Sequence, residues 1–186
     1  MSDPTIGFRC LERRDLPLLH TWLNRDFVLQ WYSRRPQTYA EVVAKYGPRI
    51  DGHAPTRCFL IRAGERAIGY IQTYAISDYP DYSAYVQVEE GAAGVDLFIG
   101  EADYIHRGLG SAILTGFLRE VIFGTTDATC CVLGPEPQNK VAIRAYEKAG
   151  FRYLKTIQLP DEPEPEYLMR IERGDVLQSS GADHAL

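Results

Sequence analysis

The chain has 186 residues, of which 45% are hydrophobic, and this is enough for one globular domain with a sizeable core. No apolar run reaches the roughly 18 residues of a membrane-spanning helix, and the N-terminus lacks the apolar region of a signal peptide, so we expect a cytoplasmic protein. The net charge of −5 argues against nucleic acid and membranes as partners, because binding to either needs clustered lysine and arginine.

Strand and helix patterns alternate at the start of the chain. Residues 5–11 predict a strand, and residues 13–23 predict a helix because their apolar side chains recur every three or four positions. Thr38, followed three residues later by Glu41, forms a capping box for a helix over residues 38–50. We expect the pair Gly47-Pro48 to end this helix or distort its last turn.

A hairpin pattern follows, at residues 58–62 and 67–75, which predict two strands joined by a loop that contains Gly64. Residues 77–85 are polar and rich in tyrosine. They lack periodicity, and we expect a loop of the kind in which substrate specificity often resides.

The second half begins with an apolar strand pattern at residues 95–99 and a helix whose apolar positions extend to Ile122. Residues 129–133 predict a buried strand. Asn139 and Gly150 suit the start and the end of a further helix. Residues 151–159 and 167–171 predict the last two strands, and we expect residues 174–186 to form a frayed tail beyond a single domain at residues 1–173.

Four cysteines lack metal-ligand spacing, and we expect them to be reduced packing residues, with no metal site and no disulfide framework. They are Cys10, Cys58, Cys130 and Cys131. Cys130 and Cys131 are adjacent, so they should point to opposite faces of a strand.

A glycine turn precedes the helix that extends to Ile122. Its sequence is Arg107-Gly108-Leu109-Gly110-Ser111, and glycines at a helix start leave backbone N–H groups open to an anion. The Walker A pattern is absent, and the dinucleotide fingerprint fails because Ile113 occupies the place of its third glycine. The turn therefore indicates a pyrophosphate site of another kind, or simply a tight turn capped by Ser111.

About thirty residues downstream stands Pro135-Glu136-Pro137-Gln138-Asn139, followed by a helix that ends Tyr146-Glu147-Lys148-Ala149-Gly150-Phe151. Together with the glycine turn, this order resembles the GCN5-related N-acetyltransferases (GNAT), whose turn has the form [QR]-x-x-G-x-[GA]. The leading Gln/Arg position is Ile105 here, so Arg107 or His106 would have to supply that phosphate contact.

Further segments are similar to the aminoglycoside 6′-N-acetyltransferases over about residues 8–172. They are His20-Thr21-Trp22-Leu23-Asn24-Arg25, Trp31-Tyr32, Gly69-Tyr70-Ile71-Gln72-Thr73-Tyr74 and Gly94-Val95-Asp96. The resemblance implies an α/β (α+β) fold with a mixed, mostly antiparallel sheet of about six to seven strands and about four flanking helices. It also implies acetyl-CoA as cofactor and a polycationic small molecule, an aminoglycoside, as substrate, with the protein a monomer or homodimer.

The resemblance also implies the residues of the site. The cofactor would contact Leu97, Phe98, Ile99, His106, Arg107, Gly108, Leu109, Gly110, Ser111, Asn139, Ala142, Tyr146 and Lys148. The substrate would contact Trp22, Trp31, Tyr32, Gln72, Tyr74, Glu89, Glu90, Asp96, Glu136 and Asp161. The acidic members would suit a polycation if they met at one cleft.

Two residues are candidates for catalysis. Asp96 interrupts an otherwise apolar strand, which is costly for a carboxylate unless it faces a site, and it can anchor the substrate ammonium or remove its proton. Tyr146 matches the family tyrosine that protonates the leaving thiolate. The oxyanion would accept a hydrogen bond from a backbone N–H between Leu97 and Ile99.

One position departs from the aminoglycoside enzymes. Many of them carry an Asp just before the Pro-x-Pro-x-Asn segment to bind a substrate amine, and Gly134 stands there in this chain. Glu136 could substitute, and Asp161 matches another substrate-facing Asp.

Two alternatives remain open. One is an N-acyltransferase of siderophore biosynthesis that acts on an N-hydroxylysine-type amine. The other is a non-catalytic acyl-CoA-binding module, which would bind the cofactor while Asp96 and Tyr146 face away from any acceptor.

Overall fold

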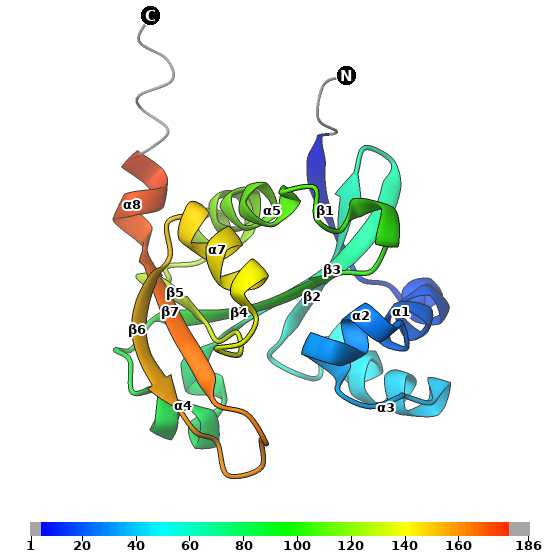
Figure 1. Ribbon diagram of the computed structural model, residues 1–186, viewed down its shortest axis with the longest axis horizontal. Coiled ribbons are helices and arrows are strands. Elements are labelled where there is room, and N and C mark those ends of the chain that lie inside the picture. The colour runs from blue at the N-terminus through cyan, green and yellow to red at the C-terminus, as the bar shows by residue number, and fades with distance from the viewer. Residues whose placement is uncertain (1–4, 179–186) are drawn as a thin grey trace, which may run out of the picture. The chain divides into compact units, whose positions relative to one another are not determined.

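The computed structural model describes residues 5–178, in which seven strands form a sheet in the order β1-β2-β3-β4-β5-β7-β6 (Figure 1). The strands are β1 (Ile6–Cys10), β2 (Arg57–Ala63), β3 (Arg66–Ala75), β4 (Ala92–Ile99), β5 (Cys130–Leu133), β6 (Arg152–Ile157) and β7 (Glu166–Glu172). β4 and β5 pair in parallel, whereas β1–β2, β2–β3, β5–β7 and β6–β7 are antiparallel. The mixed, mostly antiparallel sheet confirms the predicted fold class.

By its contacts the chain divides into two compact units. Among the described residues, the first unit holds those up to Thr73 together with Asp96–Leu109, and the second holds Tyr74–Val95 and those from Gly110 onward. β4 passes from the second unit into the first between Val95 and Asp96.

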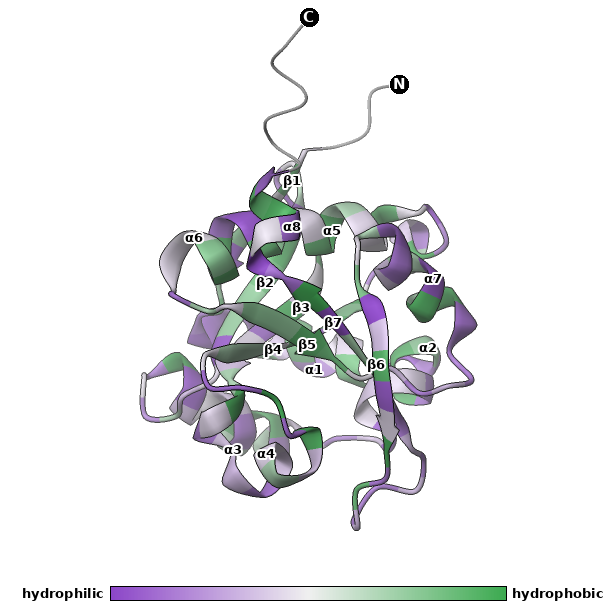
Figure 2. Cartoon of the chain, turned by 90° about the vertical axis from the view of Figure 1, so that its left-hand side faces the viewer, coloured by the Kyte–Doolittle hydropathy of each residue, from purple (hydrophilic) through white to green (hydrophobic). Residues whose placement is uncertain are grey.

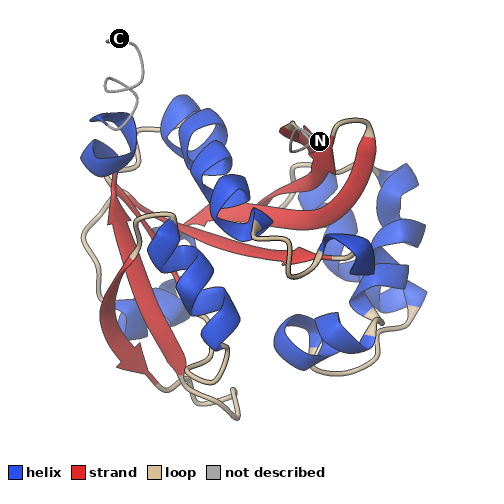
Figure 3. Cartoon of the chain, turned by 45° about the horizontal axis from the view of Figure 1, so that its top comes forward, coloured by secondary structure: helices blue, strands red, loops and turns tan. Residues whose placement is uncertain are grey.

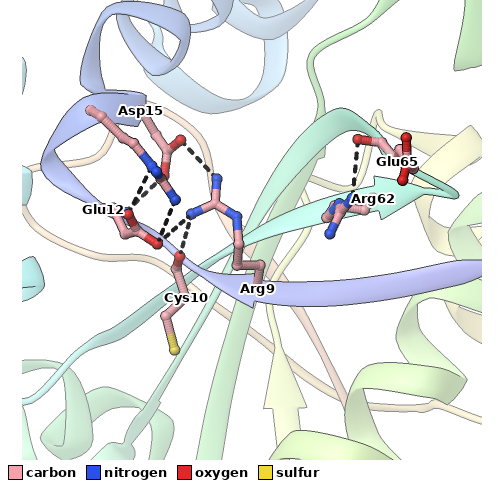
Figure 4. Close-up of polar contacts among 7 residues, drawn as sticks. Arg9, Cys10, Glu12, Asp15, Arg62 and Glu65 are labelled. Carbon is pink, nitrogen blue, oxygen red and sulfur yellow. Dashed lines mark hydrogen bonds and ion pairs between the residues drawn. The ribbon is translucent and has the colours of Figure 1, made fainter.

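In the first unit, β2 and β3 form the predicted hairpin. Ala63 pairs with Arg66 across a two-residue turn, and Gly64 there has a φ of 60°, which glycine adopts at little cost. The last part of β4 lies beside β3, because the N–H of Gly100 donates to the carbonyl of Ile68 over 2.8 Å. Strand β1 is joined to the next helix by an ion-pair cluster in which Arg9 contacts Glu12 at 3.0 Å and Asp15 at 2.8 Å (Figure 4).

Helices gather beside these strands in the first unit (Figure 1). They are η1 (Arg13–Asp15), α1 (Leu16–Leu23), α2 (Asp26–Val28), η2 (Leu29–Ser33, a π-helical turn), α3 (Tyr39–Ile50) and, after β4, η4 (Ala102–Tyr104). Helices α1, α2 and α3 share a core with β2, β3 and β4. Its buried residues are Leu11, Leu16, Leu19, Trp22, Leu23, Val28, Val42, Tyr46, Cys58, Leu60, Tyr70 and Phe98.

The predicted capping box begins α3. The N–H of Glu41 donates to the Thr38 hydroxyl over 3.2 Å, and the Glu41 carboxylate accepts from the N–H of Thr38 over 2.7 Å. The helix continues through Pro48 to Ile50, so Gly47-Pro48 does not end it. Buried Val42 and Tyr46 hold the helix in the core, and this outweighs the hydrogen bond that proline cannot donate.

In the second unit, β5 lies between the first part of β4 and β7. All four β5 residues are buried, and the strand is coloured as hydrophobic in Figure 2. Cys130 packs on one face with Val132, Leu168 and Val86. Cys131 alternates to the opposite face, as predicted. All four cysteines are free thiols.

The helices of this unit are η3 (Ile76–Asp78), α4 (Pro80–Val86), η5 (Leu118–Ile122, a π-helical segment), α6 (Phe123–Thr125), α7 (Lys140–Lys148) and α8 (Arg173–Gln178). α5 (Leu109–Phe117) begins at the last residue of the first unit and continues in the second. α5 and α7 are close neighbours, since a Cβ built on Gly110 would lie 3.1 Å from the Ala145 Cβ (Figure 3).

The expectation of a loop at residues 77–85 was wrong. Pro80 begins α4, and the N–H of Ser83 donates to the carbonyl of Tyr79 over 2.8 Å. The seven-residue helix is held by Ile76 and Val86, which are buried against β4, β5 and β7. Such a short helix depends on tertiary packing rather than on its own periodicity.

Four helices in the described part of the chain have eight residues or more, namely α1, α3, α5 and α7. α8 occupies the start of the segment that we expected to be a frayed tail, and residues 179–186 lie outside the described residues. Among residues 5–178, no helix is long and apolar enough to span a membrane.

Candidate active site

Asp96 is the first β4 residue that belongs to the first unit, and its side chain is half-buried. Its neighbour two positions on, Phe98, points to the helix-covered face, and strand alternation places Asp96 on the same face. The Asp96 carboxylate accepts a hydrogen bond of 2.7 Å from the side-chain amide of Gln72 on β3. The strand pairing therefore holds this carboxylate among the residues beneath α1 and α3.

Gln72 connects Asp96 to a larger polar network. Its carbonyl oxygen accepts from Arg49 of α3 and from the hydroxyl of Tyr70, both over 2.7 Å. The Tyr70 hydroxyl also lies 2.9 Å from the Cys58 sulfur. The Tyr70 hydroxyl is the donor in both contacts, and the Gln72 oxygen is the stronger of its two acceptors, whereas the Cys58 thiol donates to the carbonyl of Thr56 over 4.0 Å.

Aromatic rings enclose this network. Tyr70 stacks on Phe98 with ring centroids 5.6 Å apart, and Tyr32 of η2 meets Phe98 edge-on at 4.7 Å. Tyr46 of α3 meets Tyr70 edge-on at 5.5 Å, and burial raises the pKa of Tyr46 to about 12. Trp31, next to Tyr32, is 36% exposed and presents an aromatic surface to solvent. The aromatic groups are hydrogen-bonding and packing partners that stay neutral near pH 7.

Trp22 does not meet the expectation of a substrate contact. It is fully buried, and its indole N–H donates to Glu101 over 2.7 Å. A Cβ built on Gly100 would lie 2.3 Å from the indole, so glycine is needed there for the ring to fit. Glu101 also pairs with Arg66 at 2.8 Å. Trp22 is therefore a core residue that fixes the chain after β4.

The glycine turn precedes α5 directly. His106 and Gly108 have φ angles of 59° and 74°, so the chain turns tightly before the helix begins at Leu109. No atom lies within 4 Å of a Cβ built on Gly108, so the backbone there is open on that side. His106 and Arg107 are exposed, and Arg107 lies over the Tyr104 ring at 5.3 Å. The Leu109 side chain is buried, which leaves its backbone N–H as the group able to contact a ligand.

α7 begins as predicted, with the Asn139 side-chain oxygen accepting from the N–H of Ala142 over 3.1 Å. Since capping uses that oxygen, the Asn139 amide nitrogen is the end suited to contact another group. Tyr146 is half-buried, with its ring centroid 6.5 Å from that of Phe151. Lys148 is exposed in the last turn. The helix ends before Gly150, whose φ of 102° favours glycine.

The acidic candidates of the second unit differ in their surroundings. Glu89 forms an ion pair with Arg170, whose hydrogen bond lowers the pKa of Glu89 to about 2. The pairing compensates the charge of Glu89. The structure therefore gives Glu89 an intramolecular ion pair that the sequence did not predict. Glu90 and Asp161 are exposed, and Glu136 is half-buried. Another candidate of this unit, Tyr74, packs edge-on against Tyr79 at 5.1 Å.

Glu166 is a carboxylate that the sequence reasoning missed. A Cβ built on Gly134 would lie 2.5 Å from the Glu166 Oε2, so the glycine leaves the space that this side chain fills. The same oxygen accepts from the Tyr82 hydroxyl of α4 over 2.8 Å. Glu166 thus places a carboxylate beside Gly134. In the sequence, only the glycine at position 134 indicated that another side chain fills this space.

Comparison with known proteins gives a consistent result. A model of the acetyltransferase (GNAT) domain matches residues 12–159. Aminoglycoside N(6′)-acetyltransferase type 1 of Klebsiella pneumoniae is 30% identical over 165 residues, which cover 87% of this chain and 81% of that protein.

Solved structures agree with this match. The structure of aminoglycoside acetyltransferase AAC(6′)-Ib with coenzyme A has a TM-score of 0.83 and 27% identity, covering 95% of this chain and 99% of that one. The same enzyme with coenzyme A and kanamycin gives a TM-score of 0.82, 28% identity and the same coverage. With its sheet order, glycine turn and capped α7, the chain belongs to the GNAT family of acetyltransferases.

Proposed function

We propose that this chain is an acetyl-CoA-dependent N-acetyltransferase that acetylates the 6′-amine of aminoglycosides. The observation that carries the proposal is the Asp96 carboxylate, oriented by Gln72 at 2.7 Å beside a wall of tyrosine and phenylalanine rings. An oriented carboxylate suits an ammonium group, and aromatic faces suit the apolar faces of a sugar ring. The likeness to enzymes named for this activity supports the same assignment.

The glycine turn fits the pyrophosphate of coenzyme A. The nine-residue α5 leaves the N–H groups of its first turn without helical partners, and the positive φ at Gly108 opens the backbone just before them. The N–H groups from Gly108 to Ser111 would hold the phosphates, with Arg107 and His106 as adjacent cations or donors. Bound acetyl-CoA supplies the acetyl group as a thioester.

On α7, the Asn139 amide, the backbone at Ala142 and the Lys148 ammonium would contact the rest of the cofactor. From β4, one backbone N–H among Leu97, Phe98 and Ile99 would donate to the carbonyl oxygen of the acetyl group. Backbone donors of this kind stabilise the charge that develops as the amine attacks, because they are already oriented before the reaction.

Two side chains handle protons. Asp96 binds the substrate ammonium and accepts the proton that the nitrogen must lose to attack. The Tyr146 hydroxyl holds the proton that the departing sulfur takes up. The Asp96 carboxylate thus takes the proton from the amine, and the Tyr146 hydroxyl gives one to the sulfur. Positioned acid–base groups contribute about 10²–10⁴-fold to the rate.

Further contacts would select a polycationic substrate. The resemblance assigns aromatic substrate contacts to Trp31, Tyr32 and Tyr74. It assigns amine contacts to Glu90, Glu136 and Asp161, and Glu166 is a further candidate of this kind. We also propose that the protein acts in the cytoplasm, where its four thiols stay reduced, as a monomer or homodimer.

A thiol-release assay tests the proposal. Purified protein and acetyl-CoA are combined with kanamycin, tobramycin, a 6′-hydroxyl aminoglycoside, lysine or N-hydroxylysine. We expect turnover with the 6′-amino drugs and none with the 6′-hydroxyl analogue. Coenzyme A binding without turnover of any aminoglycoside would contradict the substrate assignment, and turnover of N-hydroxylysine alone would replace it.

A further inference from the structure

The amide of Gln72 is engaged at both ends inside the first unit. The side chain is 8% exposed, and it accepts from Arg49 and Tyr70 while donating to Asp96, each over 2.7 Å. A side chain held in this way has little surface to offer a substrate. Its contacts instead link a cation on α3 to the carboxylate on β4.

The chemistry of Arg49 fixes which end of the amide faces Asp96. A guanidinium can only donate, so the amide atom beside Arg49 must be the carbonyl oxygen. The amide NH₂ then faces Asp96, and a reversed amide would set donor against donor at Arg49. The network therefore has one stable direction, from Arg49 through Gln72 to Asp96.

We infer that Arg49 and Gln72 are positioning residues that act on the reaction through Asp96, by orienting its carboxylate and favouring its ionised form. This inference rests on the proposed function, in which Asp96 receives the substrate ammonium. It replaces the expectation that Gln72 contacts the substrate itself. The cation acts through a neutral amide, which orients the carboxylate and adds no charge of its own.

The neighbouring titratable groups do not compete for this role. Burial raises the pKa values of Tyr32, Tyr46, Tyr70 and Cys58, so all four stay neutral near pH 7. Burial opposes the charge of Arg49, but the surrounding Tyr70, Cys58, Tyr46 and Tyr32 outweigh this and raise its pKa. Lys45 lies over the Tyr46 ring at 5.5 Å and is exposed. Tyr32, Tyr46, Tyr70, Cys58 and Arg49 therefore keep their charge states near pH 7.

The substitution Gln72→Glu directly tests the connection from Arg49 through Gln72 to Asp96. Glutamate keeps an oxygen for Arg49 and Tyr70 but sets a second oxygen against Asp96, so the two carboxylates must share a proton. We expect the acidic limb of the kcat/KM profile to move to higher pH by about one unit or more relative to wild type. A uniform loss at every pH, with the limb unmoved, would overturn the inference.

A double-mutant cycle separates positioning from stability. Arg49→Met should lower kcat/KM by about 10- to 100-fold, as misplacement of a reacting group does, while in an Asp96→Asn background it should change kcat/KM by less than about 2-fold. Equal losses in both backgrounds would show a merely structural role. Arg35→Met is the matched control, because Arg35 pairs with Glu41 on the exposed start of α3 and should leave kcat/KM unchanged.

A measurement that does not depend on catalysis distinguishes this inference from the proposed function. Carbon-13 NMR titration of the Asp96 carboxyl in the ligand-free protein should give a higher midpoint for Gln72→Glu than for wild type. If the titration midpoint of Asp96 were the same in both proteins, the inferred action of Arg49 and Gln72 on Asp96 would be wrong, whatever the substrate is. If the midpoint moved but the protein acetylated no aminoglycoside, the inferred action of Arg49 and Gln72 on Asp96 would stand. The proposed function would then be refuted.

Discussion

Asp96 and Glu101 are two carboxylates of the first unit, one within β4 and one just beyond its end, and their partners differ in charge. Asp96 accepts from the neutral amide of Gln72, with Arg49 one hydrogen bond further away. Glu101 accepts from the Trp22 indole and pairs directly with Arg66. The Gln72 amide orients a carboxylate as a neutral donor, whereas the Arg66 guanidinium brings a positive charge to its carboxylate.

The difference separates a reacting group from a structural one. Glu101 and Trp22 fix the chain between β4 and the glycine turn, so their loss should appear in stability. Asp96 lies among aromatic rings, and its loss should appear in the rate of reaction. Substitution of Asp96 should therefore lower activity more than stability, and substitution of Glu101 should lower stability more than activity.

The largest effect on activity is expected for Asp96→Asn. Removing the charge while keeping the shape should lower kcat/KM for a 6′-amino aminoglycoside by about 10²–10⁴-fold. The free energy of unfolding, measured in urea, should change little. A loss of activity below 10-fold, with intact coenzyme A binding, would remove Asp96 from the proposed mechanism.

Trp22→Ala should give the largest loss of stability. Truncation of a fully buried tryptophan creates a cavity and should lower the free energy of unfolding by about 3–5 kcal/mol. Trp22→Phe refills much of the space and removes the hydrogen bond to Glu101, so it should cost less. If Trp22→Phe instead lowered only the affinity for substrate, our reassignment of Trp22 to the core would be wrong.

Glu101→Gln should have a smaller, pH-dependent effect. Burial opposes the charge of Glu101, but hydrogen bonds from Trp22 and Arg66 outweigh it and lower its pKa below 4.5. A lowered folded-state pKa adds stability above the ordinary glutamate pKa, and that stability disappears as pH falls through the folded value. Wild type should exceed the variant by about 1–3 kcal/mol at pH 7.

Thermal melts of both proteins from pH 7 down to pH 3 measure this difference. The gap between the two melting temperatures should narrow below pH 4.5. A gap that stays constant with pH would mean that the Glu101 charge contributes nothing. Activity at pH 7 and at a temperature where both proteins are folded should be similar, in contrast to Asp96→Asn.

The smallest effect is expected for Trp31→Ala. The side chain is 36% exposed, so its truncation should lower the free energy of unfolding far less than that of Trp22, by about 1 kcal/mol. Loss of an aromatic face should raise KM for the aminoglycoside by about 2- to 10-fold with little change in kcat. An unchanged KM would exclude Trp31 from the substrate contacts and leave Tyr32 as the aromatic candidate of that segment.

The sequence by itself determined the local features that surround the site. The Thr38–Glu41 capping box, the Gly64 hairpin, the glycine turn and the Asn139 cap all depend on residues a few positions apart. Short-range hydrogen bonds and the rarity of positive φ outside glycine make such features readable without an alignment. The same local patterns carried the resemblance to the family, and with it the expectation of a mixed sheet of about six to seven strands.

Only the tertiary structure decided which partners the polar and aromatic side chains take. Gln72 and Asp96 are 24 positions apart in the chain, and Gln72 is 23 from Arg49, so no local pattern joins them. The burial of Trp22, the helix at Pro80–Val86 and the placement of Glu166 at Gly134 likewise depend on packing between distant segments. Residue type and spacing fix the backbone locally, whereas charge compensation and burial are properties of the folded chain.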